Sequence, residues 1–384
     1  MNSNLVLTGV APIRAALHRA AATAWLEGAR RLARLRVGQR SAARDFSRIA
    51  IVGALGRSNG IAQGALIQHA ALARWGAEVE LVDATRALRN PTARSTHRPA
   101  TAYVFHCGGP QTASLIHAVL PHAARAWRVG YWAWELPDPP DDWEQFGDLV
   151  DEIWTPSSFA AESLAKLFDT PIKVVPHAVE PAGGRRMRGN APFTVLVMAD
   201  SRSSFARKNP HSAVQAFRAA FGDDPDARLI VKIGGGGNDA RSLADAVMRL
   251  PNGSVIEEFL DAAEMTALYR ASDVLLSLHR AEGFGLPMLE AMAQGVPVVA
   301  TGWSGNMDFM SATDSVLVPH RLVQVEDSAG IYRASIWAEA DVEAAAAALR
   351  HLAGDRNAYE EKSKAAFAAA CRFYTTPIVE DIAA

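Results

Sequence analysis

Short apolar runs separated by helix-length segments recur along most of the chain. In the first half, the pattern predicts strands at residues 48–55, 78–82, 102–105 and 129–134. The second half repeats the alternation, with strands at 193–198, 228–233, 274–278 and 296–300 and helices at 210–221, 263–271 and 287–294. Because alternating strands and helices form parallel sheets covered on both faces, the chain is predicted to be an α/β protein with two doubly wound, Rossmann-like domains.

A stretch without periodicity separates the two halves. Residues 176–192 are rich in Pro, Gly and Arg, which favours a domain boundary there. We predict a basic helical extension at 1–47, an N-terminal domain at 48–180, a C-terminal domain at 190–365 and a last helix at 366–384 that packs back toward the N-terminal domain. Ligands are expected at the carboxyl ends of the strands, in the cleft between the domains.

An arginine-rich helix is predicted ahead of the first strand. Apolar residues recur there at helical spacing, at Ala22, Trp25, Leu26, Ala29, Leu32 and Ala33. Residues 1–47 carry a net charge of +6, from Glu27, Asp45 and eight arginines: Arg14, Arg19, Arg30, Arg31, Arg34, Arg36, Arg40 and Arg44. The pattern fits either an extension packed on the protein's own surface or an interfacial helix that docks on anionic lipid or a partner.

Composition narrows the class of protein. At 384 residues the chain suits two domains, and its 49% hydrophobic and 21% charged residues indicate packed cores. A net charge of −2 argues against a dedicated nucleic-acid binder. Cys107 and Cys371 are too few for a disulfide framework. No apolar stretch is long enough to span a membrane and no secretion signal is visible, so we expect a cytoplasmic protein.

The segment AEGFGLPMLEAM, residues 281–292, carries the strongest chemical signal. Pro287 suits the first turn of a helix, and the glycines ahead of it let backbone approach a ligand closely. Free amides at such a helix start favour an anion such as a diphosphate. Glu282 on the loop and Glu290 inside the helix are expected to face the same cleft, where a carboxylate can accept hydrogen bonds from paired sugar hydroxyls.

These residues carry a family resemblance. Glu282 and Glu290 resemble the E-x7-E pair of retaining GT-B glycosyltransferases, and the run EGFGLPMLEAMAQGVPVVAT resembles glycosyltransferase family 4, the group 1 transferases. Arg202 and Lys208 match the strand-end Arg and the Lys six residues later that bind the donor diphosphate in that family. Gly302–Asn306 match the loop over the donor. GYWAWELPDPPDDW and DEIWTPSSFAAESL resemble the bacterial branch that acts in surface-polysaccharide assembly.

The resemblance implies a retaining, metal-independent hexosyltransferase with the GT-B architecture, in which 48–180 takes the acceptor and 190–365 binds the nucleotide sugar. A GDP-, UDP- or dTDP-sugar is the expected co-substrate, with no other cofactor, and a glycan or lipid-linked molecule is the expected acceptor. We predict catalytic roles for His106, Glu282, Arg202 and Lys208. Donor-binding roles are predicted for Glu290, Gly283, Phe284, Gly285, Leu286 and Asn306, and acceptor-side roles for Gly56, Asn59 and Glu135.

Structural and functional alternatives stay open. Gly56–Gly60 also reads as a plain strand-to-helix connection, His106 as a structural histidine and Glu135 as a satisfied buried carboxylate. A GT-B-like phosphorylase or sugar-nucleotide epimerase would share the two-domain cleft, and a non-catalytic sugar-nucleotide binding module is a further alternative. A third alternative is an adaptor at the membrane surface, and only the basic N-terminal helix supports it. In that case residues 11–44 would contact the inner face of the cytoplasmic membrane.

Overall fold

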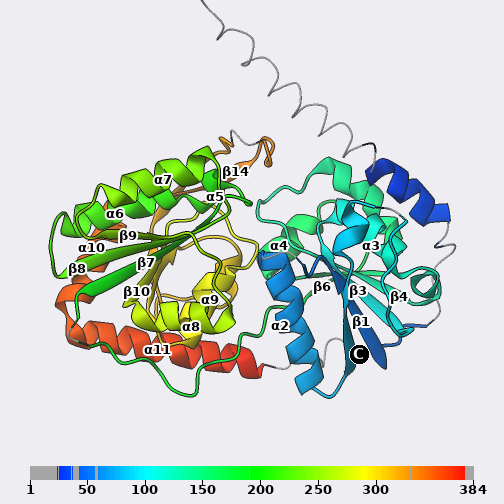
Figure 1. The fold of residues 1–384 in the computed structure, drawn as a ribbon, viewed down its shortest axis with the longest axis horizontal. Helices are drawn as coiled ribbons and strands as arrows, with labels where there is room; N and C mark the ends of the chain where they lie inside the picture. Colours follow the sequence, from blue (N-terminus) through cyan, green and yellow to red (C-terminus); the bar gives the residue numbers. More distant parts are fainter. Residues whose placement is uncertain are drawn as a thin grey trace, which may run out of the picture.

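Two parallel sheets, one in each half of the chain, form the cores of two domains that lie side by side in Figure 1. The computed structural model describes residues 24, 26–35, 37, 43–56, 59–90, 92–189, 191–327 and 330–376. The N-terminal domain is blue to green in the figure, and the C-terminal domain is green to red. The predicted α/β class with two doubly wound domains is therefore confirmed.

The N-terminal sheet has the strand order β2-β1-β3-β4-β5-β6, with every pair parallel. Its strands are β1 (Arg48–Gly53), β2 (Glu78–Asp83), β3 (Ala102–Cys107), β4 (Trp127–Trp132), β5 (Glu152–Thr155) and β6 (Ile172–Val174). The helices between them are α2 (Gly60–Arg74), α3 (Thr112–Val119) and α4 (Ser158–Leu164), with 3-10 turns η1 (Thr85–Leu88), η2 (Gly109–Gln111), η3 (His122–Arg125) and η4 (Asp141–Leu149).

The C-terminal sheet has the order β12-β11-β10-β7-β8-β9, again all parallel. Its strands are β7 (Phe193–Asp200), β8 (Ala227–Gly234), β9 (Gly253–Ile256), β10 (Val274–Ser277), β11 (Val298–Thr301) and β12 (Val316–Val318). Its helices are α5 (Phe205–Lys208), α6 (Pro210–Phe221), α7 (Asn238–Met248), α8 (Ala262–Ala271) and α9 (Leu286–Ala293), with the turn η5 (Gly305–Asp308).

Each sheet has a point where the strand order reverses, between β1 and β3 in the first and between β7 and β10 in the second. Loops that leave neighbouring strands there diverge to opposite faces of the sheet, which opens a place for ligands at the strand ends. The sequence motifs follow these strands: Gly56 and Asn59 come after β1, His106 lies near the end of β3, Lys208 follows β7 and Glu282 follows β10.

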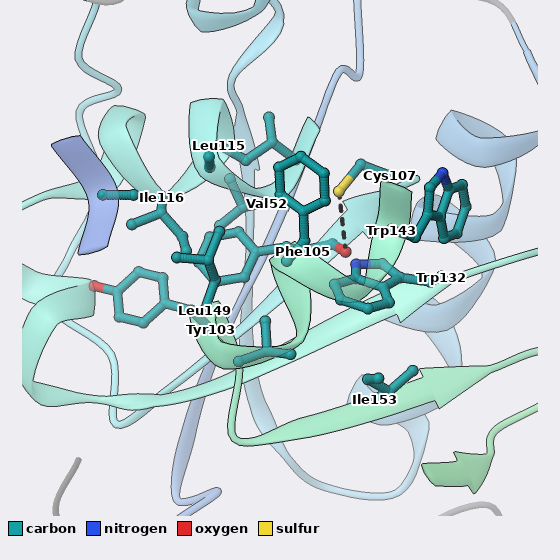
Figure 2. Close-up of a cluster of buried hydrophobic side chains, with 14 of the residues drawn as sticks. Val52, Tyr103, Phe105, Cys107, Leu115, Ile116, Trp132, Trp143, Leu149 and Ile153 are labelled. Atoms are coloured by element: carbon teal, nitrogen blue, oxygen red, sulfur yellow. Dashed lines mark hydrogen bonds between the residues drawn. The ribbon is translucent and has the colours of Figure 1, made fainter. Parts of the chain in front are cut away.

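The N-terminal core is rich in aromatic side chains. Figure 2 shows Tyr103 and Phe105 of β3 packed with residues of α3, and Trp132 of β4 beside Trp143 of η4. Trp132 and Trp143 meet edge to face with ring centroids 6.2 Å apart. These buried rings fix the spacing between the sheet and its covering segments.

The basic N-terminal extension packs on this core in its described part. Residues 26–35 are helical, and Ala29, Ala33 and Val37 are buried in the same hydrophobic cluster as the aromatic rings. The His117 ring bonds the carbonyl of Ala29 at 2.9 Å. This part follows the packed-extension interpretation. Ala22, Trp25, Arg14, Arg19, Arg36 and Arg40 lie outside the described residues.

The chain ends with α10 (Val342–Gly354) and α11 (Arg356–Thr375). In Figure 1, α11 runs along the bottom of the C-terminal domain toward the N-terminal domain. There the Arg74 guanidinium lies 3.7 Å over the Tyr374 ring and donates to its carbonyl. The predicted boundary at residues 365–366 falls inside α11, and residues 377–384 lie outside the described part. Among the described helices, none is both long and apolar enough to cross a bilayer.

A two-stranded antiparallel hairpin, absent from the sequence prediction, stands apart from both large sheets. It consists of β13 (His320–Gln324) and β14 (Ile336–Ala340), and the loop between them is residues 325–335. We call residues 320–340 the arm. In Figure 1 its orange loop lies at the top, between the two domains.

Candidate active site

Two cations converge on Glu282. The chain leaving β7 forms the single turn α5, whose start is capped by the Ser204 hydroxyl accepting from the Arg207 amide at 3.1 Å. The turn directs Lys208 onto Oε1 of Glu282, and Arg207 Nη1 lies 3.1 Å from Oε2 of the same carboxylate. Arg207 also donates to the Ala281 carbonyl at 2.7 Å. The loop after β10 and the turn after β7 are thereby joined.

Pairing keeps the buried Glu282 carboxylate ionised. Glu282 is 7% exposed. Burial alone raises its pKa, but the charges of Lys208 and Arg207 outweigh burial and lower the pKa to about 2. The site therefore holds a buried anion between two cations, in a place where water screens charge weakly.

Close backbone packing explains the glycines of this loop. Gly285 has φ +98°, and a Cβ at Gly305 would lie 2.3 Å from the carbonyl oxygen of Gly283. The Gly305 amide donates to the Glu282 carbonyl at 2.9 Å. A larger residue at 285 or 305 would separate the loop 282–285 from the loop 302–306.

Glu290 lies in α9, which has Pro287 in its first turn as the sequence predicts. Its Oε2 accepts a hydrogen bond of 2.7 Å from the Tyr269 hydroxyl of α8. Burial raises the pKa of Glu290 to about 7, and the hydrogen bond from Tyr269 opposes that shift only in part. The carboxyl group is thus oriented by one donor and titrates near neutral pH.

The N-terminal domain reaches the charged cluster through Glu135. Its Oε1 lies 3.8 Å from Nη2 of Arg207, which belongs to the other domain. Nearby, the Ser157 hydroxyl donates to the Gly283 carbonyl at 2.6 Å. Glu135, Arg207, Lys208 and Glu282 therefore form one group of charges across the domain interface, with the predicted acceptor-side and donor-side residues in contact.

His106 is buried in the N-terminal domain, with 2% of its surface exposed. Its Nε2 bonds the Gln68 side-chain oxygen, and its ring stacks on Tyr131 at a centroid distance of 4.1 Å. Burial, and then the nearby His177, lowers the pKa of His106 well below its ordinary value. The ring is a neutral, packed group, and its catalytic role stays a prediction.

Arg202 and Lys208 do not meet in this structure. Arg202 forms two hydrogen bonds to Asp200, at 2.9 and 2.8 Å, and its side chain lies over Gly234 and Gly235 at the end of β8. Since 49% of the Arg202 side chain is exposed, it lies at the rim rather than inside the cluster. The buried cation beside Lys208 is Arg207.

The other predicted site residues make contacts that stabilise the fold. Asn59 caps α2 by accepting from the Ala62 amide at 2.9 Å, and the Gly56 amide donates to the Thr85 hydroxyl at 3.0 Å. The Phe284 ring is 4% exposed and lies 5.1 Å from the His177 ring. Asn306 is fully buried and contacts the His279 ring at 3.1 Å. Leu286 opens α9 and is half-buried.

Sequence reasoning missed Arg207, which pairs with Glu282, Tyr269, which bonds Glu290, and Tyr332, which packs on Trp134. Arg207 precedes Lys208 directly, so the Arg-Lys pair was the available signal. Tyr269 and Tyr332 have no local signal, because their partners are distant in the sequence: Tyr269 and Glu290 are 21 residues apart. Within the ranges that the structure describes, no three or more His, Cys, Asp or Glu side chains are grouped to hold a metal ion.

Comparison with known proteins supplies independent findings. A family model described as "Family 4 Glycosyltransferase in conflict systems" matches residues 158–370. A D-inositol 3-phosphate glycosyltransferase of Corynebacterium glutamicum (strain R) is 35% identical over 104 residues, which are 26% of this chain and 25% of that protein. The chain thus spans about a quarter of the length of the curated relatives it matches.

Solved structures share the fold of nearly the whole chain. HepE of Anabaena, in complex with UDP and glucose, has a TM-score of 0.63 at 15% identity and covers 88% of this chain and 98% of its own. Sucrose-phosphate synthase of Thermosynechococcus elongatus has a TM-score of 0.65 at 14% identity and covers 88% and 96%. The predicted GT-B architecture is confirmed.

Proposed function

The chain belongs to the family 4 glycosyltransferases in conflict systems, of the group 1 type, and on that premise we propose that it is a retaining hexosyltransferase. In this proposal it moves a sugar from a nucleoside-diphosphate donor to a glycan or lipid-linked acceptor in cell-surface polysaccharide synthesis. The presence of UDP in the related HepE structure supports a nucleotide-sugar co-substrate.

The convergence of Lys208 and Arg207 on Glu282 carries the proposal. Two cations at the switch point of the C-terminal sheet suit a diphosphate, and the loop amides before α9 add further donors. When the donor binds, its phosphates would compete with Glu282 for these cations. We propose that Arg202 leaves Asp200 to make a further phosphate contact, and that Glu290 accepts from the ribose hydroxyls.

The proposed reaction breaks the bond between the sugar C1 and the β-phosphate oxygen. The acceptor hydroxyl oxygen forms the new bond to C1 on the face from which the phosphate departs, so the anomeric configuration is kept. The hydroxyl proton passes to the departing phosphate, and a glycoside and a nucleoside diphosphate are the products. Fixed cations favour this step because negative charge grows on the leaving oxygen.

Thermal-shift measurements with GDP, UDP, dTDP and ADP test the nucleotide site directly. One base should raise the melting temperature clearly above the others, since a ligand at ~100 times its dissociation constant stabilises by ~2.7 kcal/mol. A Lys208→Ala variant should lose most of that shift. If none of the four stabilises the wild-type protein, the proposed function is wrong.

Product analysis tests the finer claims. With the nucleotide sugar selected by that screen, the product should have the same anomeric configuration as the donor, read from its NMR coupling constants. Excess EDTA or added Mg²⁺ should change the rate little, because Lys208 and Arg207 supply the positive charge. An inverted product would reject the retaining mechanism, and activity that EDTA abolishes and Mg²⁺ restores would reject metal-independent transfer.

A cytoplasmic location with peripheral membrane contact through residues 11–44 is also proposed. In the described part of that segment, Leu35 is 81% exposed and Leu32 is 46% exposed, while the Arg31 side chain is 74% exposed. Each cation near an anionic bilayer adds about 1 kcal/mol of attraction. Flotation with anionic liposomes should recover the full chain but not a chain lacking residues 1–44, and recovery of neither would reject the contact.

A further inference from the structure

The start of α4 forms a junction between the two domains. In Figure 1, α4 lies where the N-terminal domain meets the C-terminal domain. The Ser157 hydroxyl donates to the Gly283 carbonyl at 2.6 Å. The amide and the hydroxyl of Ser158 both donate to Oδ2 of Asp308, at 2.7 and 3.1 Å. These two neighbouring serines therefore bind different segments of the C-terminal domain, which are the loop after Glu282 and the turn η5.

Three adjacent amides of the loop after Glu282 find no hydrogen-bond acceptor among the described residues. They belong to Gly283, Phe284 and Gly285, and all three residues are buried. Because more than ~90% of buried backbone N–H groups in proteins are paired, three unpaired neighbours point to an acceptor that the described chain does not supply. Gly285 has φ +98°, and runs of amides that include a left-handed residue form concavities that bind anions. The loop is therefore suited to a phosphate.

Ser157 determines the direction of the middle amide. The peptide bond between Gly283 and Phe284 is trans, so its carbonyl and its N–H point in opposite directions. Because the Ser157 hydroxyl holds that carbonyl, the Phe284 N–H points away from Ser157. Without this bond the peptide plane would be free to rotate, since Gly283 has no side chain to restrict its backbone.

The preceding residue, in contrast, is held within the C-terminal domain. The Glu282 amide donates to the Ser304 hydroxyl at 2.8 Å, and the Glu282 carbonyl accepts from the Gly305 amide at 2.9 Å. In the part of the chain that the structure describes, the Gly283 carbonyl accepts one hydrogen bond, and its donor is in the other domain. Ser157 is 0% exposed, so solvent has little access to this bond. The orientation of the peptide after Gly283 therefore depends on the contact between the domains.

We propose that Ser157 is a positioning residue whose hydroxyl orients the peptide between Gly283 and Phe284, so that the Phe284 amide can donate to the donor diphosphate. The inference rests on the proposed function for the identity of this anion. It gives the N-terminal domain a part in donor binding, because the amide is held in this orientation only while the two domains are in contact.

The test removes the Ser157 hydroxyl in two ways. Ser157 also caps α4 by accepting from the Ala160 amide at 3.2 Å, so the variants must separate positioning from capping. Both Ser157→Ala and Ser157→Gly remove the hydroxyl, but glycine at a helix N-cap costs much less stability than alanine. In calorimetric titration, both variants should bind the selected nucleoside diphosphate about tenfold more weakly than the wild type. Affinity for the monophosphate of the same base should change less than twofold, because it lacks the terminal phosphate.

Ser158→Ala is the matched control, because it removes the neighbouring hydroxyl and does not touch the loop after Glu282. The Ser158 amide still donates to Asp308, so the junction is retained. This variant should bind both nucleotides within twofold of the wild type. Undiminished diphosphate affinity in the two Ser157 variants would overturn the inference. An equal loss for the monophosphate and the diphosphate, or a loss in Ser157→Ala that is absent from Ser157→Gly, would also overturn it, since helix capping would then explain the result.

Inorganic pyrophosphate, titrated alongside, separates this inference from the proposed function. Wild-type protein that binds pyrophosphate but no nucleoside diphosphate would overturn the proposed function. The two Ser157 variants should then bind pyrophosphate about tenfold more weakly than the wild type, and equal affinity would overturn the inference as well. Wild-type protein that binds neither ligand would overturn both. Diphosphate binding that is normal in the wild type and in both Ser157 variants would overturn the role of Ser157 alone.

Discussion

In the C-terminal domain, Glu282 is buried near the end of β10 as a paired charge, whereas His106 and Tyr131 of the N-terminal domain are buried near the ends of β3 and β4 as neutral rings. Glu282 is ionised between Lys208 and Arg207. His106 stacks on Tyr131, and burial lowers the pKa of His106 and raises that of Tyr131, so both are uncharged. The free-energy cost of burying a polar group is therefore offset by ion pairing at Glu282 and avoided at His106 and Tyr131 by keeping the rings uncharged.

The difference indicates how the two sides divide the work. Paired charges can exchange one partner for another, so the cations that hold Glu282 can hold a phosphate instead. A stack of neutral rings has no charge to offer an anion and mainly fixes shape. His177 extends the stack, since its ring lies 5.5 Å from Tyr131 and 5.1 Å from Phe284 of the opposite domain.

Removing a cation from the charged cluster of the C-terminal domain should have the largest effect on activity. Lys208→Ala should lower kcat by ~10²–10³-fold with a smaller change in donor affinity, because a fixed charge favours the transition state over the bound donor. Steady-state kinetics with the selected donor measure the effect. Lys364→Ala, at an exposed position on α11, should match the wild type. An active Lys208→Ala enzyme would show that another residue supplies the charge.

Neutralising the buried anion should destabilise the fold. Glu282→Gln leaves Lys208 and Arg207 without their buried counter-ion, which should lower the free energy of unfolding by about 3 kcal/mol. Urea unfolding measures this, with the exposed Glu361→Gln as control. We also expect turnover to fall more than nucleotide binding. Unchanged stability would mean that the cluster contributes no pairing energy.

The buried neutral histidines of the N-terminal domain should make the free energy of unfolding fall at acid pH. Burial lowers the pKa of His177 to about 4, below the ordinary value of 6.5, so the unfolded chain binds more protons between these values. Stability is present above pH 6.5 and is lost as pH falls toward 4, by up to about 3 kcal/mol for this group. In urea unfolding from pH 7 to 4, His177→Asn should flatten that loss, and the exposed His351→Asn should not. Equal slopes in all three proteins would contradict burial as neutral histidine.

Glu290 offers the smallest predicted effect. Because burial raises its pKa to about 7, the carboxylate that would accept from ribose is lost as pH falls below 7. Affinity for the nucleoside diphosphate should weaken about tenfold between pH 8 and pH 5.5. Glu290→Gln should bind about tenfold more weakly at pH 8 and show less dependence on pH. A wild-type affinity in this variant would remove Glu290 from the nucleotide site.

The sequence predicts the two domains and part of the site because those features are local. Strand and helix periodicity is visible within each segment, and the glycines, Pro287 and Glu282 lie within one short run. The family resemblance placed Lys208 and Glu282 in one predicted donor site, but it did not predict the ion pair between them, which joins residues 74 apart.

The remaining site depends on contacts that no local pattern records. The arm residue Arg333 pairs with Asp142 across 191 residues, and Tyr332 packs on Trp134 only because the arm folds onto the other domain. Arg202 was expected at the diphosphate, but the adjacent Asp200 binds its guanidinium in this structure. The spacing of residues in the sequence can identify a cationic side chain of the site, but which carboxylate that side chain pairs with depends on three-dimensional packing.

Calorimetric titration of the wild-type protein with a nucleoside diphosphate and with the monophosphate of the same base tests the central claim most directly. If the cluster of Lys208, Arg207 and Glu282 is a diphosphate site, the diphosphate should bind at least about tenfold more tightly, and Lys208→Ala should remove most of that preference while leaving monophosphate affinity nearly unchanged. Equal affinity for the two nucleotides, or an undiminished preference in Lys208→Ala, would contradict the account.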